Sequence, residues 1–133
     1  MTKITINGKT YVLRYDMTVM EWIEDKFGNV KDAFDRLRKA KESAETITAL
    51  FCAMANCAND YLGVNDYISE KNTTIINKHT SPGRVATITR AIMEAIADGN
   101  RQQAGDDDDN EVHDEYLKEL EEQERAKNSK TGS

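Results

Sequence analysis

Several features that would indicate a membrane protein, a secreted protein or a familiar enzyme are missing from this 133-residue sequence. It has no run of about 18 apolar residues and no charged stretch leading into an apolar one, so we expect neither a membrane span nor a secretion signal. Glycine-rich phosphate loops, nucleophile elbows and clustered metal ligands are also missing. We therefore expect a cytosolic protein that is not an enzyme.

Cysteine and histidine are scarce, with two residues of each. Cys52 and Cys57 fall in one predicted helix, about 140° apart around its axis, so they cannot readily bridge each other or bind one metal together. We interpret both as buried, apolar thiols. His79 and His113 have no partner at ligand spacing, which favours solvated side chains. The sequence thus predicts no metal site and no cofactor.

Acidic charge is concentrated near the C-terminal end. Residues 106–133 contain 11 Asp and Glu against 4 Lys and Arg, whereas residues 1–105 contain 13 against 14. The low isoelectric point therefore describes a tail and not the whole surface. The run from Asp106 to Asp109 predicts an extended linker. A weak amphipathic helix is predicted after it, with an apolar strip made of Val112, Tyr116, Leu117 and Leu120.

The first residues predict a β-hairpin. Apolar and polar residues alternate on both sides of Asn7-Gly8, the strongest short turn signal for a hairpin. A two-residue turn at this point places Ile4 opposite Tyr11 and Thr2 opposite Leu13. A lone hairpin is only marginally stable in water, so helices or a partner strand must cover its apolar face.

A short helix follows the hairpin almost without a loop. Thr18 is the predicted N-cap, Glu21 would complete a capping box, and Gly28 supplies the left-handed residue after the helix. Trp22 and Phe27 lie on its apolar stripe. They are either core residues or part of a partner-binding surface, and the sequence leaves both interpretations open.

The remaining periodicities predict a mainly α (α+β) fold, in which the hairpin precedes a bundle of four to five short helices. We expect one folded domain over residues 1–100, followed by an acidic tail over residues 101–133 that is flexible, weakly helical or disordered. The predicted elements are a hairpin over 2–15 and helices over about 18–27, 30–40, 43–62, 65–78 and 82–98. The last helix has Ser81-Pro82 at its start and closes at Asp98-Gly99-Asn100.

The stretch LRYDMTVMEWIEDKFGNVKDAFDRL, residues 13–37, resembles the opening of the tail assembly chaperones of long-tailed bacteriophages and prophages. The similarity lies in the strand, the Asp-Met entry, the helix ending in EDKFG and the Asp-Ala-Phe start of the next helix. Looser similarity continues through residues 43–62 and 81–99.

The resemblance implies a non-catalytic role in the cytoplasm of the host bacterium. Such proteins bind tail tube subunits and the tape-measure protein, and they do not remain in the mature virion. The family offers no residue-level site to carry over. Candidate partner-binding residues are therefore the apolar ones named above: Trp22, Phe27, Val112, Tyr116, Leu117 and Leu120.

Two other classes of function stay open. An acidic-tailed regulator directed at the host would mimic nucleic acid through residues 106–124. A small self-associating scaffold would pair through the edges of its hairpin. The basic cluster that follows the first helix, Lys31 to Lys41, is interpreted as a solvated face, because it has no interleaved aromatic platform and residues 1–105 are nearly neutral. We expect neither direct nucleic-acid binding nor a small-molecule substrate.

Overall fold

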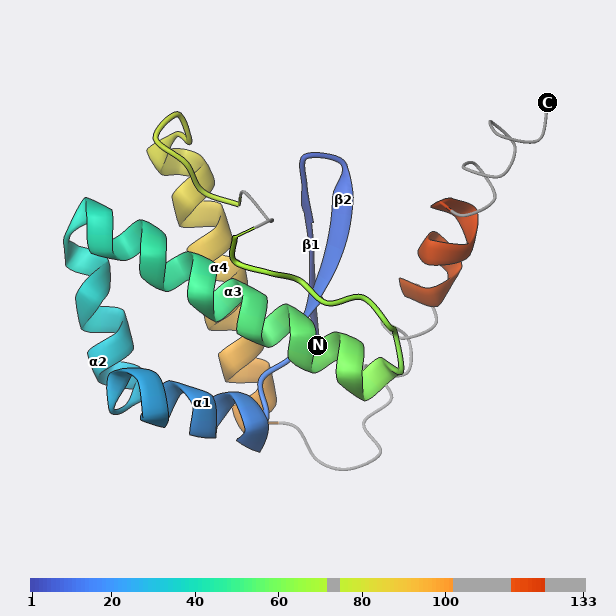
Figure 1. Cartoon of the computed structure of the whole chain (residues 1–133), viewed down its shortest axis with the longest axis horizontal. Coiled ribbons are helices and arrows are strands. Elements are labelled where there is room, and N and C mark those ends of the chain that lie inside the picture. The colour runs from blue at the N-terminus through green and yellow to red at the C-terminus, as the bar shows by residue number, and fades with distance from the viewer. Residues whose placement is uncertain (72–74, 102–115, 124–133) are drawn as a thin grey trace. The chain divides into compact units, whose positions relative to one another are not determined.

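The computed structural model describes residues 1–71, 75–101 and 116–123 (Figure 1). The chain divides into two compact units, Met1–Gln102 and Gln103–Ser133. The first unit is mainly α with a small N-terminal hairpin, as predicted. Its elements in order are β1 (Thr2–Ile6), β2 (Lys9–Leu13), α1 (Met17–Phe27), α2 (Val30–Asp35), the 3-10 helix η1 (Arg36–Arg38), α3 (Ala40–Leu62) and α4 (Pro82–Arg101).

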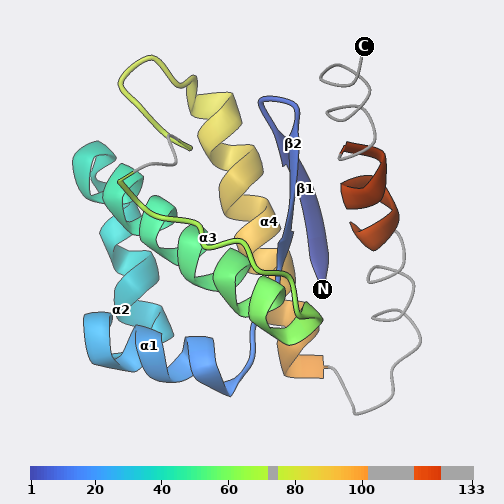
Figure 2. The ribbon, with the colours of Figure 1, turned by 45° about the vertical axis from the view of Figure 1, so that its right-hand side comes forward.

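The hairpin has the predicted register. Ile4 lies opposite Tyr11 and Thr2 opposite Leu13 in the antiparallel pair. Asn7-Gly8 forms the turn with φ angles of 52° and 80°, the left-handed values that this two-residue turn requires. β2 contacts mainly α3, and β1 contacts α4 (Figure 2). The helices therefore supply the cover that a two-stranded sheet needs.

The start of α1 differs from the prediction, because its N-cap is Asp16 and not Thr18. The Asp16 Oδ1 atom accepts a hydrogen bond of 2.9 Å from the Thr18 backbone N–H, which places Thr18 inside the first turn. The predicted capping box with Glu21 is therefore wrong. The predicted end is confirmed: Gly28 follows the helix with a φ of 97°.

The helix predicted over residues 30–40 is wrong in its second half. Asn29 caps α2, since its Oδ1 atom accepts a 2.7 Å hydrogen bond from the Asp32 N–H. The chain then tightens into η1 and becomes extended at Lys39, with φ −110° and ψ 131°. α3 starts directly afterwards, three residues before the predicted start at residue 43. This break redirects the chain so that η1 packs against α3.

The helix predicted over residues 65–78 is also wrong. The described parts of this region, residues 64–71 and 75–81, contain no helix. The Asn56 side chain of α3 instead makes two hydrogen bonds to the backbone of Ile68, of 2.9 Å to its carbonyl and 2.7 Å from its N–H. Asn59 donates a third bond of 2.9 Å to the carbonyl of Asp66. Side chains of α3 thus satisfy backbone groups that a helix would have paired internally.

α4 starts as predicted and ends later than predicted. Ser81 caps it, with its Oγ atom accepting a 3.2 Å hydrogen bond from the Arg84 N–H. The helix continues to Arg101, so the end predicted at residue 98 is wrong. Gly99 is a packing residue and not a terminator, because a Cβ atom there would lie 2.2 Å from the Tyr15 carbonyl oxygen.

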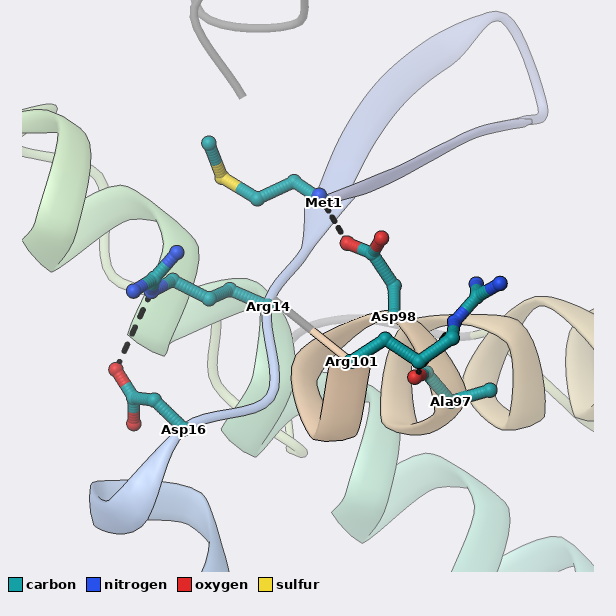
Figure 3. A network of polar contacts seen from close by, with 6 residues as sticks. All are labelled: Met1, Arg14, Asp16, Ala97, Asp98 and Arg101. Atoms are coloured by element: carbon teal, nitrogen blue, oxygen red, sulfur yellow. Dashed lines mark hydrogen bonds and ion pairs between the residues drawn. The ribbon is translucent and has the colours of Figure 1, made fainter. Parts of the chain in front are cut away.

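Polar contacts surround this close approach (Figure 3). The amino group of Met1 lies 2.6 Å from an Asp98 carboxylate oxygen, which ties the beginning of β1 to the end of α4. Nearby, the Arg14 Nε atom donates a 3.3 Å hydrogen bond to Asp16. The second of these contacts joins the residues on either side of Tyr15.

The core of the first unit is centred on α3. Phe51, Leu50 and Met54 of this helix are almost fully buried, and the Phe51 ring meets the Tyr11 ring edge to face at 5.0 Å. The hairpin, α1 and α4 contribute Leu13, Ile23, Ile88 and Ile92. Val12, on the opposite face of β2 from Leu13, is also buried but lies outside this cluster.

The second unit contributes one described helix, residues 116–123. Tyr116, Leu117 and Leu120 therefore lie in a helix, as predicted. Val112, the acidic run over residues 106–109 and the terminal residues 124–133 lie outside the described residues.

Candidate functional site

A groove of about 320 Å³ lies between α1, α3 and the segment that follows α3. We call it the Trp22 groove. Its floor is mostly apolar, since Val19, Ala49 and Ala53 line it. It is lined by Thr18, Val19, Trp22, Ala49, Cys52, Ala53, Asn56, Cys57, Asp60, Tyr67, Ile68 and Glu70.

Trp22 and Phe27, two of the predicted partner-binding residues, lie together on α1. Their rings meet edge to face, with centroids 5.9 Å apart and planes 80° apart. Both are partly buried and pack against the hydrophobic core. The Lys26 ammonium group lies 5.3 Å from the Trp22 ring, and the Arg36 guanidinium lies 5.2 Å from the Phe27 ring. Trp22 also lines the groove, so its ring contacts both the core and the opening.

The outer lip of the groove is residues 64–71. Its Ile68 side chain is buried, whereas Tyr67 is 82% exposed. The hydrogen bonds from Asn56 and Asn59 hold the backbone of this lip against α3. An exposed tyrosine on a backbone fixed at both sides presents a large, rigid contact surface at low entropic cost.

Two free thiols lie in the groove wall. Burial raises the pKa of Cys52 to about 11, and the nearby carboxylate of Glu70 acts in the same direction. Burial, together with a hydrogen bond to the Asp16 carboxylate, raises the pKa of Cys57 to about 12. Both side chains are therefore neutral thiols near pH 7. Cys52 is buried, as predicted. Cys57 is only partly buried and donates a hydrogen bond to Asp16, so the prediction of a buried, apolar thiol is wrong for this residue.

The Asp16 carboxylate accepts hydrogen bonds from Cys57 in the groove wall and from the first turn of α1. Burial alone would raise its pKa, but hydrogen bonds from Cys57, the Thr18 N–H and Arg14 outweigh that effect. The pKa of Asp16 is consequently below its ordinary value, and the group stays ionised. The same carboxylate therefore caps α1 and accepts a hydrogen bond from the Cys57 thiol.

The rim of the groove is acidic on one side. Asp60 and Glu70 line it, and the Lys26 ammonium lies 3.9 Å from Glu70. An apolar floor with a charged rim is the arrangement that holds one or two large apolar side chains of a protein partner. The geometry thus supports protein recognition.

Neither a metal cluster nor a membrane helix is found in the described part of the chain. No three His, Cys, Asp or Glu residues there are grouped so that they could hold a metal ion. Within the same residues, no helix is both long enough and apolar enough to cross a membrane.

The structure brings together Trp22 and Phe27, and it places Tyr116, Leu117 and Leu120 on one helix of the second unit. Sequence reasoning missed Tyr67 and Ile68, because they lie in the segment for which a helix was predicted. The useful signal was the pair of asparagines inside the apolar pattern of α3, Asn56 and Asn59, since amides on a buried helix face need partners.

No protein-family model matches the chain, and neither the curated proteins nor the solved structures searched contain a match.

Proposed function

We propose that this chain is a non-catalytic tail assembly chaperone of a long-tailed bacteriophage or prophage, which binds tail tube subunits and the tape-measure protein during tail morphogenesis. In this proposal it acts in the cytoplasm of the host bacterium and is not part of the mature virion. One observation carries the proposal: the stretch that resembles the family, residues 13–37, provides Thr18, Val19 and Trp22 to the wall of the Trp22 groove.

The chemistry of this groove suits the task. Subunits that polymerise carry apolar surfaces that must be shielded before assembly, and a chaperone needs a complementary apolar surface of its own. Trp22 offers part of its ring, and Tyr67 stands exposed on the opposite lip. On α1, Met17 and Met20 are 66% and 37% exposed, and flexible methionine side chains adapt to varied partners.

Binding to the proposed clients is the direct test. Tail tube and tape-measure proteins of a long-tailed phage would be co-expressed with the full chain, and their solubility and co-purification measured. Tyr67→Ala should weaken binding by about tenfold or more, as expected for a central aromatic contact. Tyr61→Ala is the matched control, because Tyr61 is 57% exposed and does not line the groove.

Trp22→Ala separates a folding role from a binding role. Truncating a fully buried tryptophan to alanine lowers the free energy of unfolding by about 3–5 kcal/mol. Trp22 is only partly buried, so Trp22→Ala should lower it by about 2 kcal/mol. We expect a folded variant that loses the client. If Tyr67→Ala and Trp22→Ala both retain full client affinity, the groove is not the client site. If the unmodified chain binds neither protein, the proposed function is wrong.

A further inference from the structure

A second groove, on another part of the first unit, has a different chemical character. Two adjoining hollows of about 550 and 520 Å³ lie between the N-terminal parts of α3 and α4. They share Ser43, Pro82 and Val85, so they form one continuous depression, which we call the α3/α4 groove. Figures 1 and 2 both show the starting ends of α3 and α4 on the same side of this unit.

The floor of the α3/α4 groove is apolar. Ala40, Ala44 and Ile76 line one hollow, and Leu37 and Met93 line the other. Met93 is 54% exposed, although it is a large apolar side chain. Two hollows of this size along one depression match the helix-in-groove mode, in which apolar side chains three or four residues apart enter successive pockets.

Every charged residue that lines this groove, among those the structure describes, is basic. Lys41 and Lys78 border the first hollow and Arg90 borders the second. Within the described residues none of these three forms an ion pair, and all are exposed. The Trp22 groove differs in this respect, since Asp60 and Glu70 line it.

The backbone adds positive potential at the same place. α3 and α4 both begin at this groove, with Ala40 and Pro82 as their first residues, so the positive ends of two helix dipoles flank it. The N-cap residue of α3, Lys39, makes no side-chain hydrogen bond to the first turn. Basic side chains and two helix starts therefore flank the apolar floor, and Glu42, the acidic residue in the first turn of α3, lines neither hollow.

We propose that the α3/α4 groove binds an acidic amphipathic helix of a partner protein. Apolar side chains of that helix occupy the two hollows, while its carboxylates pair with Lys41, Lys78 and Arg90. The apolar floor selects a protein helix over nucleic acid, whose phosphates would meet the cations but leave the floor uncovered. This inference stands apart from the proposed function, which concerns the Trp22 groove.

The test uses the full chain and a synthetic probe. The probe is a fluorescently labelled peptide of about 15 residues with leucine at i, i+3, i+4 and i+7 and glutamate elsewhere, a length at which a free helix is only marginal. A second peptide replaces every glutamate by lysine. Fluorescence anisotropy should show that the acidic peptide binds about tenfold or more tightly than the basic one, and circular dichroism should show helix forming on binding.

A charge-reversal variant assigns the binding to this groove. Lys41→Glu/Lys78→Glu/Arg90→Glu should weaken binding of the acidic peptide by about tenfold or more. Lys31→Glu/Arg101→Glu/Lys118→Glu changes the net charge equally at exposed sites that line neither groove, and it should keep most of the affinity. Val85→Asp, which places a charge in both hollows, should also abolish binding while circular dichroism shows a folded chain.

Several results would overturn the proposal. Equal losses of peptide affinity in the two charge-reversal variants would indicate diffuse electrostatic attraction and not binding in this groove. Equal affinity for the acidic and the basic peptide would show that the groove does not select an acidic partner. Displacement of the acidic peptide by a short DNA duplex at lower concentration than by unlabelled peptide would favour nucleic acid. Tighter peptide binding by Glu121→Lys/Glu122→Lys would identify the acidic segment of the chain itself as the occupant.

Discussion

Gly99→Ala is expected to destabilise this protein, although alanine is the better helix former. An added Cβ atom would lie 2.2 Å from the Tyr15 carbonyl oxygen and 3.1 Å from its carbonyl carbon. Both are backbone atoms, and the chain around them is held firmly. The Arg14 N–H donates a 3.1 Å hydrogen bond to the Met54 carbonyl, and Asp16 caps α1. Relief of the clash therefore requires α4 to move away from Tyr15 and the other residues that follow β2.

The magnitude follows from two opposing effects. Replacing glycine by alanine in an open helix gains about 1 kcal/mol. Overpacking a closely fitted site costs about 1–3 kcal/mol, and more where backbone must move. Since the contact at Tyr15 is with backbone, we expect a net loss of about 2 kcal/mol. The melting temperature should fall by roughly 10 °C.

Urea unfolding followed by far-UV circular dichroism measures this loss, with Gly83→Ala as the matched control. Gly83 lies in the first turn of α4, where an added Cβ atom would meet nothing closer than the Ser81 Oγ atom at 4.0 Å. Gly83→Ala should therefore leave stability unchanged or raise it by up to about 1 kcal/mol. A Gly99→Ala protein at least as stable as the unmodified chain would refute the close approach of α4 to Tyr15.

Three further predictions concern the Trp22 groove. Asn56→Ala should lower the free energy of unfolding by about 1–3 kcal/mol and speed amide hydrogen exchange at Ile68, because two backbone groups of Ile68 lose their hydrogen-bond partner. Asn65→Ala, at an exposed position, is the control. Unchanged exchange at Ile68 in Asn56→Ala would show that these bonds do not hold the lip. Asp16→Asn keeps an N-cap but removes the charge, so it should reduce stability at neutral pH. Because the folded-state pKa of Asp16 is lowered, its contribution is present above its ordinary pKa of 3.8 and is lost as the pH falls through the folded value. Urea titrations at several pH values should therefore show the two proteins converge in acid; a constant difference would count against the charge. Cys57, with a pKa of about 12, should be alkylated at pH 8 at least about a hundredfold more slowly than a free thiol, and rapid labelling of the folded chain would disprove the raised pKa.

The hairpin and some of the helix ends were predictable because their signals are local. The Asn7-Gly8 turn fixes the register by itself, and Gly28 and Asn29 mark a helix end and a helix start through their own backbone and side-chain preferences. The start of α4 at Ser81-Pro82 is likewise set by the preferences of these two residues. In each case the residues that carry the signal also make the contact.

The wrong predictions arose where contacts with residues distant in sequence determine the local structure. Thr18 and Asp16 are both acceptable N-caps, and Asp16 is further held by Arg14 and Cys57, the second of which is remote in sequence. Gly99 resembles a helix terminator until Tyr15 is seen beside it. The candidate site was predicted only in part for the same reason: Trp22 was visible on its apolar stripe, whereas Tyr67 depends on hydrogen bonds from α3.

The bonds between α3 and the lip have a consequence for how the groove can change. Asn56 and Asn59 bind backbone atoms of the lip at Ile68 and Asp66, and they make no demand on the side chains there. The side chain at position 67 can therefore be exchanged while the path of the chain is preserved. Because Tyr67 is 82% exposed whereas Ile68 is buried in the core, substitutions at position 67 would change the surface that the groove offers to a partner without changing the fold.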